Sequence, residues 1–62
     1  MDYIKAKARK SQLENYLNQA VEAGAETITE IKKQASEMYR ENNHEQISIL
    51  EKQEVYKNYF GN

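Results

Sequence analysis

Two stripes of apolar residues at helical spacing, separated by one break at residues 24–26, constrain the fold of this chain more than any other feature. Within each stripe the residues recur at steps of three and four, the period of a helix that buries one face. Lys10 interrupts the first stripe. The first stripe consists of Tyr3, Ala6, Leu13, Leu17 and Ala20, and the second begins with Ile28, Ile31, Ala35 and Met38. The pattern predicts an all-α fold.

The break carries a helix stop signal followed directly by a start signal. Gly24 stands where the end of a helix favours a residue that tolerates the left-handed backbone conformation. Three residues later, Thr27 and Glu30 match a capping box, in which both side chains accept hydrogen bonds from backbone N–H groups of the first turn. A stop followed by a start is typical of a helical hairpin. Its first helix is expected over residues 2–23, with Asp2 as N-cap.

Two helix boundaries have alternatives. A second capping-box match at residues 11–14 offers a later start for the first helix, which would leave residues 1–10 as a loose arm. The second stripe weakens around residues 41–45, where five polar residues interrupt it, so the helix could be broken near residues 42–46. A cap near Asn43 would there begin a third helix that folds back. The apolar residues of that third helix would be Ile47, Leu50, Tyr56 and Phe60.

We expect a single long second helix over residues 27–60 in preference to a broken one. From residue 28 to residue 59 it would measure about 48 Å, and the first helix roughly 30 Å, at ~1.5 Å per residue. The overhang would leave Ile49, Tyr56 and Tyr59 uncovered. A second copy of the chain covers them most simply, so the hairpin is predicted to pair into a homodimeric four-helix bundle.

The apolar content is low for a folded chain of 62 residues. Leu, Ile, Val and Phe supply 11 residues, which is below the roughly 20% at which disorder becomes a serious alternative. The net charge of −1 argues against disorder, because disordered chains normally carry a high net charge. Without cysteine there is no disulfide framework and no thiolate zinc site. Five tyrosines supplement the core, and a partner chain is the remaining usual source of stability.

Charge is divided unevenly along the chain. The first ten residues hold Lys5, Lys7, Arg9 and Lys10 against one acidic residue, whereas the rest holds five basic and nine acidic residues. This basic segment is a candidate contact for nucleic acid phosphates or for an acidic partner. Specific recognition of nucleic acid needs base-reading side chains on an element that fits a groove, and no helix-turn-helix pattern is visible. A solvated surface, or one that forms salt bridges with another molecule, is the preferred interpretation.

No residue pattern indicates catalysis or a bound metal or cofactor. Carboxylates recur in pairs at helical spacing, as at Glu37 and Glu41, but acid–base catalysis also needs a pocket that shifts their pKa values. A lone histidine, His44, lies in a polar run, where it is far more often solvated than a metal ligand. We therefore expect a protein that is not an enzyme and that holds no metal or cofactor.

The C-terminal aromatic residues are the main candidates for partner binding. Spacings of three and four place Tyr56, Tyr59 and Phe60 on one side of a helix, and Tyr39 beside the main stripe is a further candidate. Aromatic side chains are favoured interface anchors, but for these three residues packing within the chain or across a homodimer is preferred over a foreign partner. We expect a small adaptor or inhibitor of a larger protein. The alternatives are a nucleic-acid-associated regulator that dimerises and a purely structural assembly protein.

The start of the chain holds no apolar run long enough for a signal peptide or a membrane span. We therefore expect a cytoplasmic location and no membrane contact.

Overall fold

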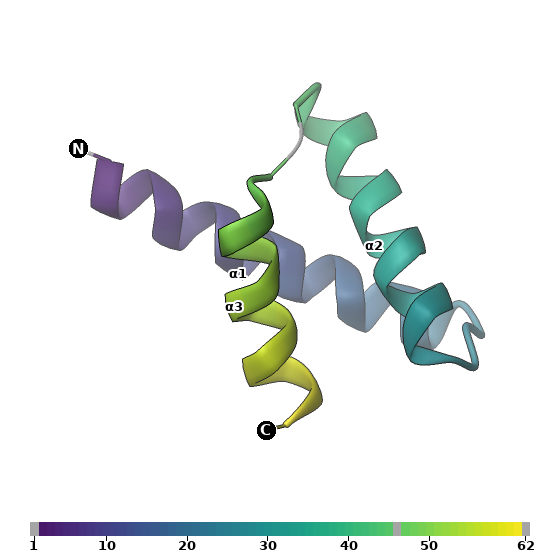
Figure 1. Ribbon diagram of the computed structural model, residues 1–62. Coiled ribbons are helices and arrows are strands. Elements are labelled where there is room, and N and C mark those ends of the chain that lie inside the picture. Colours follow the sequence, from purple (N-terminus) through teal and green to yellow (C-terminus); the bar gives the residue numbers. More distant parts are fainter. Residues whose placement is uncertain (1, 46, 62) are drawn as a thin grey trace.

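The computed structural model describes the backbone of residues 2–45 and 47–61 and the side chains of these residues from position 4 onward. These described residues form three helices, α1 (Asp2–Glu22), α2 (Ile28–Asn43) and α3 (Ile49–Phe60), which Figure 1 labels. Within the described residues there is no strand, so the predicted all-α fold is confirmed.

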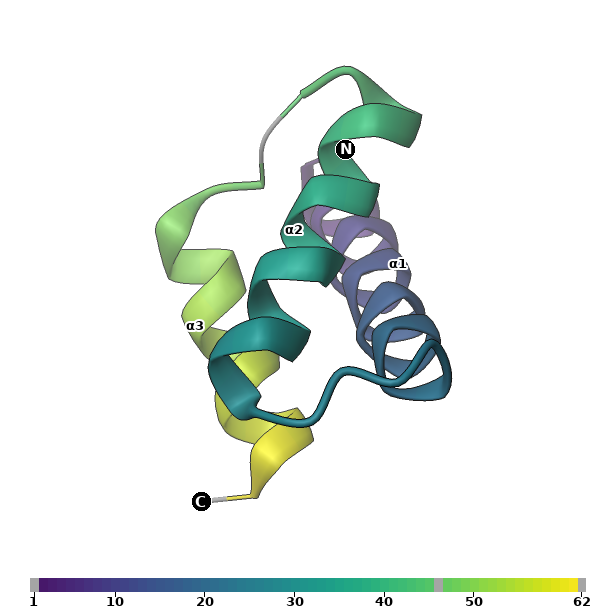
Figure 2. The same ribbon diagram turned by 90° about the vertical axis from the view of Figure 1, so that its right-hand side faces the viewer.

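Both shorter helices pack on α1, which is the longest of the three at 21 residues. α2 and α3 lie on the same side of α1 and run in opposite directions, as Figures 1 and 2 show. The resulting molecule is flat, with extents of 36 × 28 × 16 Å and a radius of gyration of 11.1 Å. Each of the two shorter helices therefore has one face on α1 and another in water.

The turn between α1 and α2 forms as its sequence predicts. Gly24 has a φ of +105°, and its N–H donates to the carbonyl of Val21 at 3.1 Å. The next N–H, of Ala25, donates to the carbonyl of Ala20 at 3.2 Å. These two bonds are the Schellman pattern, which satisfies the last carbonyls of a helix. α2 then begins at the predicted cap, where Thr27 Oγ1 accepts from the N–H of Glu30 at 3.1 Å.

The preferred prediction of one helix from residue 27 to residue 60 is wrong, because the chain turns between residues 43 and 49. His44 ends α2 in the left-handed conformation (φ 58°, ψ 28°), and its N–H donates to the carbonyl of Arg40. Ser48 then caps α3, since its hydroxyl accepts from the N–H of Glu51 at 3.2 Å. Buried Ile47 anchors the connection in the core. α3 thus folds back, as the broken alternative expected, although its cap is Ser48 and not Asn43.

The later start for α1 is also wrong, because the helix continues through residues 11–14 from Asp2. Residues 4–10 are therefore part of a helix and not a loose arm. The predicted cap at Asp2 and the place of Tyr3 in the first stripe concern side chains that lie outside the described residues.

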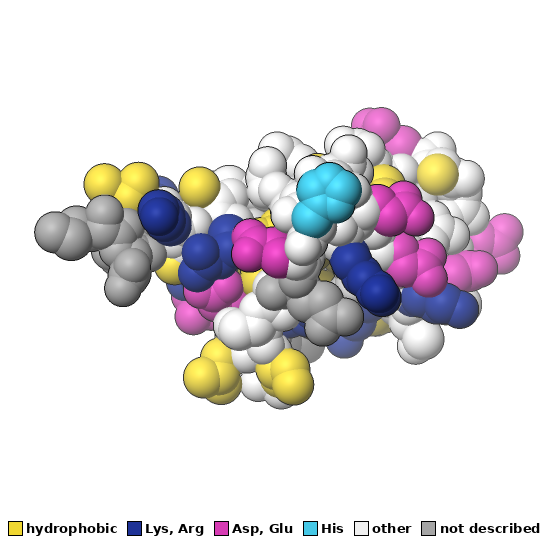
Figure 3. Space-filling view, turned by 90° about the horizontal axis from the view of Figure 1, so that it is seen from above, with side chains coloured by type: hydrophobic (Ala, Val, Ile, Leu, Met, Phe, Trp, Pro, Cys, Tyr) yellow, Lys and Arg dark blue, Asp and Glu magenta, His cyan; other side chains and the backbone are white. Residues whose placement is uncertain are grey.

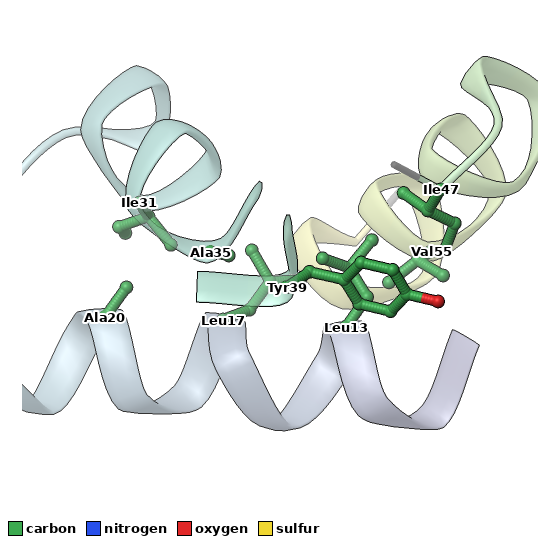
Figure 4. Close-up of a cluster of buried hydrophobic side chains, with 8 residues drawn as sticks. All are labelled: Leu13, Leu17, Ala20, Ile31, Ala35, Tyr39, Ile47 and Val55. Atoms are coloured by element: carbon green, nitrogen blue, oxygen red, sulfur yellow. The ribbon is translucent and has the colours of Figure 1, made fainter. Parts of the chain in front are cut away.

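The core lies in the angle between α1 and the two shorter helices, and Figure 4 shows its side chains. Its buried members are Leu13, Leu17, Ala20, Ile31, Ala35, Tyr39, Ile47 and Val55. The stripe predicted for α1 accounts for three of them, Leu13, Leu17 and Ala20. On α2 the buried residues are spaced by four, so that Tyr39 takes the central place and Met38 only flanks the core.

Tyr39 is the main correction to the predicted partner surface. Its side chain is 1% exposed, and its ring extends from α2 over Leu13 toward Ile47 and Val55 (Figure 4). Tyr16 of α1 meets it edge-on, with ring centroids 6.2 Å apart. A ring in this position fills the space between α2 and α3 because the chain has few large aliphatic side chains to do so. Tyr39 is therefore not available to a partner in this fold.

Candidate protein-binding surface

Three aromatic side chains gather at the C-terminal end of α3. Phe60 lies between the other two, with its ring centroid 5.1 Å from that of Tyr59 and 6.4 Å from that of Tyr56. The Tyr59 contact is edge-to-face, with an interplanar angle of 76°, which is a favoured geometry for aromatic pairs. All three residues flank the core and stay half-exposed. We call Tyr56, Tyr59 and Phe60 the aromatic cluster.

Polar groups of the other helices hold the aromatic cluster in place. The Tyr59 hydroxyl donates to Asn18 Oδ1 of α1 at 2.6 Å, and the Tyr56 hydroxyl is 3.1 Å from Ser36 Oγ of α2. Lys32 of α2 places its Nζ 4.9 Å from the centroid of the Tyr56 ring, a cation–π distance. It also lies 5.7 Å from the centroid of the Phe60 ring. These contacts orient the aromatic rings within the chain itself.

Two of the four basic residues in the predicted basic segment form ion pairs with α3. Arg9 donates to Glu51 through two nitrogens, Nε to Oε1 at 3.1 Å and Nη2 to Oε2 at 2.8 Å. This paired geometry is the strong form of an arginine–carboxylate contact. The hydrogen bond from Arg9 holds the pKa of Glu51 below its ordinary value, and the same bond raises the pKa of Arg9. Lys10 forms a second ion pair, with Glu54, at 2.8 Å.

Lys5 and Lys7 are the exposed remainder of the basic segment. They lie on the first turns of α1, one on either side of Ala6. On the face of the molecule in Figure 3, basic and acidic side chains are interleaved. Two lysines on a surface of mixed charge offer few phosphate contacts. Arg9 and Lys10 form their ion pairs within the chain, where the sequence had led us to expect a solvated surface or ion pairs with another molecule.

The most exposed large apolar side chains of the described residues lie outside the predicted partner-binding set, although Ile49 was expected to need cover from a second copy. Ile49 and Leu50, in the first turn of α3, are 71% and 78% exposed, and Ile4 near the start of α1 is 68% exposed. The signal was present in the sequence: Ser48 and Glu51 match a capping box, which starts a helix directly before two adjacent aliphatic residues. We call Ile49 and Leu50 the aliphatic pair.

The hollows of this surface are small or open. One of 120 Å³ lies between α1 and α3, over Val55, and is rimmed by Lys7, Lys10 and Glu14. Another, of 470 Å³, opens at the end of α2 and is lined by charged side chains and by His44. Among the described residues, no group of three or more His, Cys, Asp or Glu side chains is placed to hold a metal ion. Glu37 and Glu41 are exposed on α2.

In the described part of the chain, none of the helices is both long and apolar enough to cross a bilayer. No protein-family model, no curated protein and no solved structure matches this chain significantly.

Proposed function

We propose that this chain is a small non-enzymatic protein-binding module, an adaptor or inhibitor that presents its aromatic cluster to a larger protein. The observation that supports the proposal is the arrangement of Tyr56, Tyr59 and Phe60 as one half-exposed group at the end of α3. Rings of this kind bury a large area with little loss of side-chain freedom, and they dominate binding energy at many interfaces.

Preorganisation is the second argument. Because Asn18 and Ser36 already hold the two tyrosine hydroxyls, binding would order few additional side chains. The ammonium group of Lys32 beside the rings adds a positive charge at the edge of the cluster. The matching partner surface is an apolar side chain that inserts against the rings, next to a carboxylate that faces Lys32.

Capture of partners from an extract of the source organism, followed by calorimetry with the purified partner, tests this proposal. Tyr59→Ala and Phe60→Ala should each weaken binding by about tenfold or more, as expected for residues at the centre of an interface. Ile4→Ser, at the opposite end of α1, is the matched control and should leave the affinity unchanged. Urea unfolding of each variant separates lost binding from lost folding.

A regulator that binds nucleic acid would behave differently. Its binding would fall steeply with rising salt and would be lost on Lys5→Ala and Lys7→Ala, whereas aromatic burial responds little to salt. Binding that survives Tyr59→Ala and Phe60→Ala but not the lysine substitutions would overturn the protein-binding proposal.

A further inference from the structure

We propose that the surface along which α2 faces α3 binds an acidic segment of the larger protein. A carboxylate of that segment would lie between Arg40 and Lys52, and an apolar side chain would lie against the aromatic cluster. This inference rests on the proposed function and adds the chemistry of the partner to it.

Two rows of side chains meet along this surface, which we call the α2–α3 surface. In each row the residues recur every four positions, a spacing that places them on one side of a helix. Its members are Lys32, Ser36 and Arg40 of α2 and Lys52, Tyr56 and Phe60 of α3.

Contacts at one end of the α2–α3 surface fix how the two rows align. The Nζ of Lys32 lies 4.9 Å from the ring centroid of Tyr56, and the Tyr56 hydroxyl is 3.1 Å from Ser36 Oγ. The helices run in opposite directions (Figures 1 and 2). The next turn of α2 therefore brings Arg40 toward Lys52, which lies one turn before Tyr56 on α3.

A hollow of 100 Å³ lies where these two cations meet. It is lined by Arg40 and Lys52 together with Ser36, Glu37 and the buried Ile47. Among the described residues, neither Arg40 nor Lys52 forms an ion pair, and Glu37 at the same hollow reaches neither of them. Two like charges beside one hollow repel each other, so a carboxylate placed between them by another molecule would be attracted to both.

The rest of the α2–α3 surface favours a protein segment over a nucleic acid as the source of this negative charge. Nucleic acid gains its affinity from many phosphate contacts, whereas this surface offers three cations and is aromatic at its other end. An arginine also binds a carboxylate through two parallel N–H donors.

The length of the α2–α3 surface limits the sequence of the segment. From Lys32 to Arg40 the helix rises about 12 Å at ~1.5 Å per residue. An extended peptide covers that distance in about four residues at ~3.3 Å each. We therefore expect an acidic residue about four positions from an apolar or aromatic one.

Selection from a library of random peptides displayed on phage, followed by calorimetry with the selected peptides, tests this inference. The selected sequences should share the expected pair of residues. Arg40→Gln and Lys52→Gln should each weaken binding by about fivefold or more, as expected for one lost charge contact. Lys33→Gln and Lys57→Gln are the matched controls, because they remove the same charge from exposed positions of the same helices, outside the α2–α3 surface. Both should leave the affinity unchanged, and urea unfolding shows whether each variant keeps its fold.

An exchange of charges tests the contact itself. Arg40→Glu should no longer bind the selected acidic peptide. A second peptide, in which lysine replaces the acidic residue, should bind Arg40→Glu better than it binds the wild-type chain. Damage to the fold would not be repaired by a change in the peptide.

The outcomes distinguish this inference from the proposed function. Binding that needs Phe60 but is indifferent to Arg40 and Lys52 overturns the acidic partner and leaves the aromatic cluster as the binding surface. Binding that needs the two cations but not Phe60 contradicts both proposals. The acidic partner is also wrong if the selected peptides lack acidic residues, or if only an oligonucleotide binds and does so through Arg40 and Lys52.

Discussion

At the scale of single residues, Tyr39 shows how this chain compensates for its few aliphatic side chains. Its ring occupies the centre of the core, while its hydroxyl is buried and has no hydrogen-bond partner among the described residues. Burial, followed by the nearby charge of Glu45, raises the pKa of the phenol. The ring therefore stabilises the fold, and the hydroxyl adds nothing that the described contacts explain.

Substitution of Tyr39 separates these two contributions. Tyr39→Phe keeps the ring and removes the unpaired hydroxyl, so the free energy of unfolding should stay level or rise by up to about 1 kcal/mol. Tyr39→Ala should lower it by about 3–5 kcal/mol, the usual loss for a large aromatic side chain in a core. Urea unfolding measures both. A loss of more than about 1 kcal/mol for Tyr39→Phe would show that the hydroxyl has a partner after all.

At the scale of the helices, side-chain capping marks where α2 and α3 start. The sequence holds capping-box matches at Ser11, Thr27 and Ser48, and the structure uses the last two. Ser11 lies inside α1, because the residues before it already belong to the helix. A cap signal therefore acts only where the preceding residues do not extend the helix.

Alanine substitutions at the three serine and threonine positions test this account of the helix starts. Ser48→Ala and Thr27→Ala should each lower the free energy of unfolding by about 1 kcal/mol, the typical value for a lost N-cap. Ser11→Ala should leave it level or raise it slightly, since alanine is the better helix former. Thermal or urea unfolding of the three variants gives the comparison. Equal losses at Ser11 and Ser48 would contradict the start of α1 at Asp2.

The docking of α3 should weaken in acid. The pKa of Glu51 is lowered by its hydrogen bond with Arg9, so the folded state holds this carboxylate ionised more strongly than the unfolded state does. The stabilisation that the ionised Glu51 gives the fold is fully present above its ordinary pKa of 4.5. It is lost as the pH falls through the lowered pKa of the folded state.

Urea unfolding between pH 7 and pH 2 measures this loss. Glu51→Gln should flatten the acid limb of the stability curve, and Glu41→Gln, at an exposed position, should not. If the wild-type and Glu51→Gln curves run parallel through the acid range, the Arg9–Glu51 contact does not stabilise the fold.

At the scale of the whole molecule, residues that cap or end helices predicted the fold better than the spacing of the apolar residues did. The hairpin turn was predictable because Gly24 and Thr27 act through nearby backbone groups. The fold-back of α3 was not preferred because the stripe of the second helix can be extended in phase through residue 45, and periodicity alone does not detect a left-handed residue such as His44.

The candidate site also has one part that follows from local spacing in the sequence and another that depends on how the helices pack. The spacing of Tyr56, Tyr59 and Phe60 predicts that they share a helix side, which the ring contacts bear out. The burial of Tyr39 depends on how three helices meet, and the pairing of Arg9 with Glu51 joins residues 42 positions apart. Contacts of that range follow from the tertiary arrangement and leave no local trace in the sequence.

The central claim is that α3 folds back beside α2 within one chain, and a distance between two labels tests it most directly. Because the chain has no cysteine, spin labels can be attached at Lys33→Cys and Lys57→Cys, two exposed positions on α2 and α3. In one continuous helix these positions lie about 36 Å apart at 1.5 Å per residue. At concentrations where the mass is that of a monomer, we predict a distance well below this value. A distribution centred near that length under the same conditions would contradict the three-helix fold.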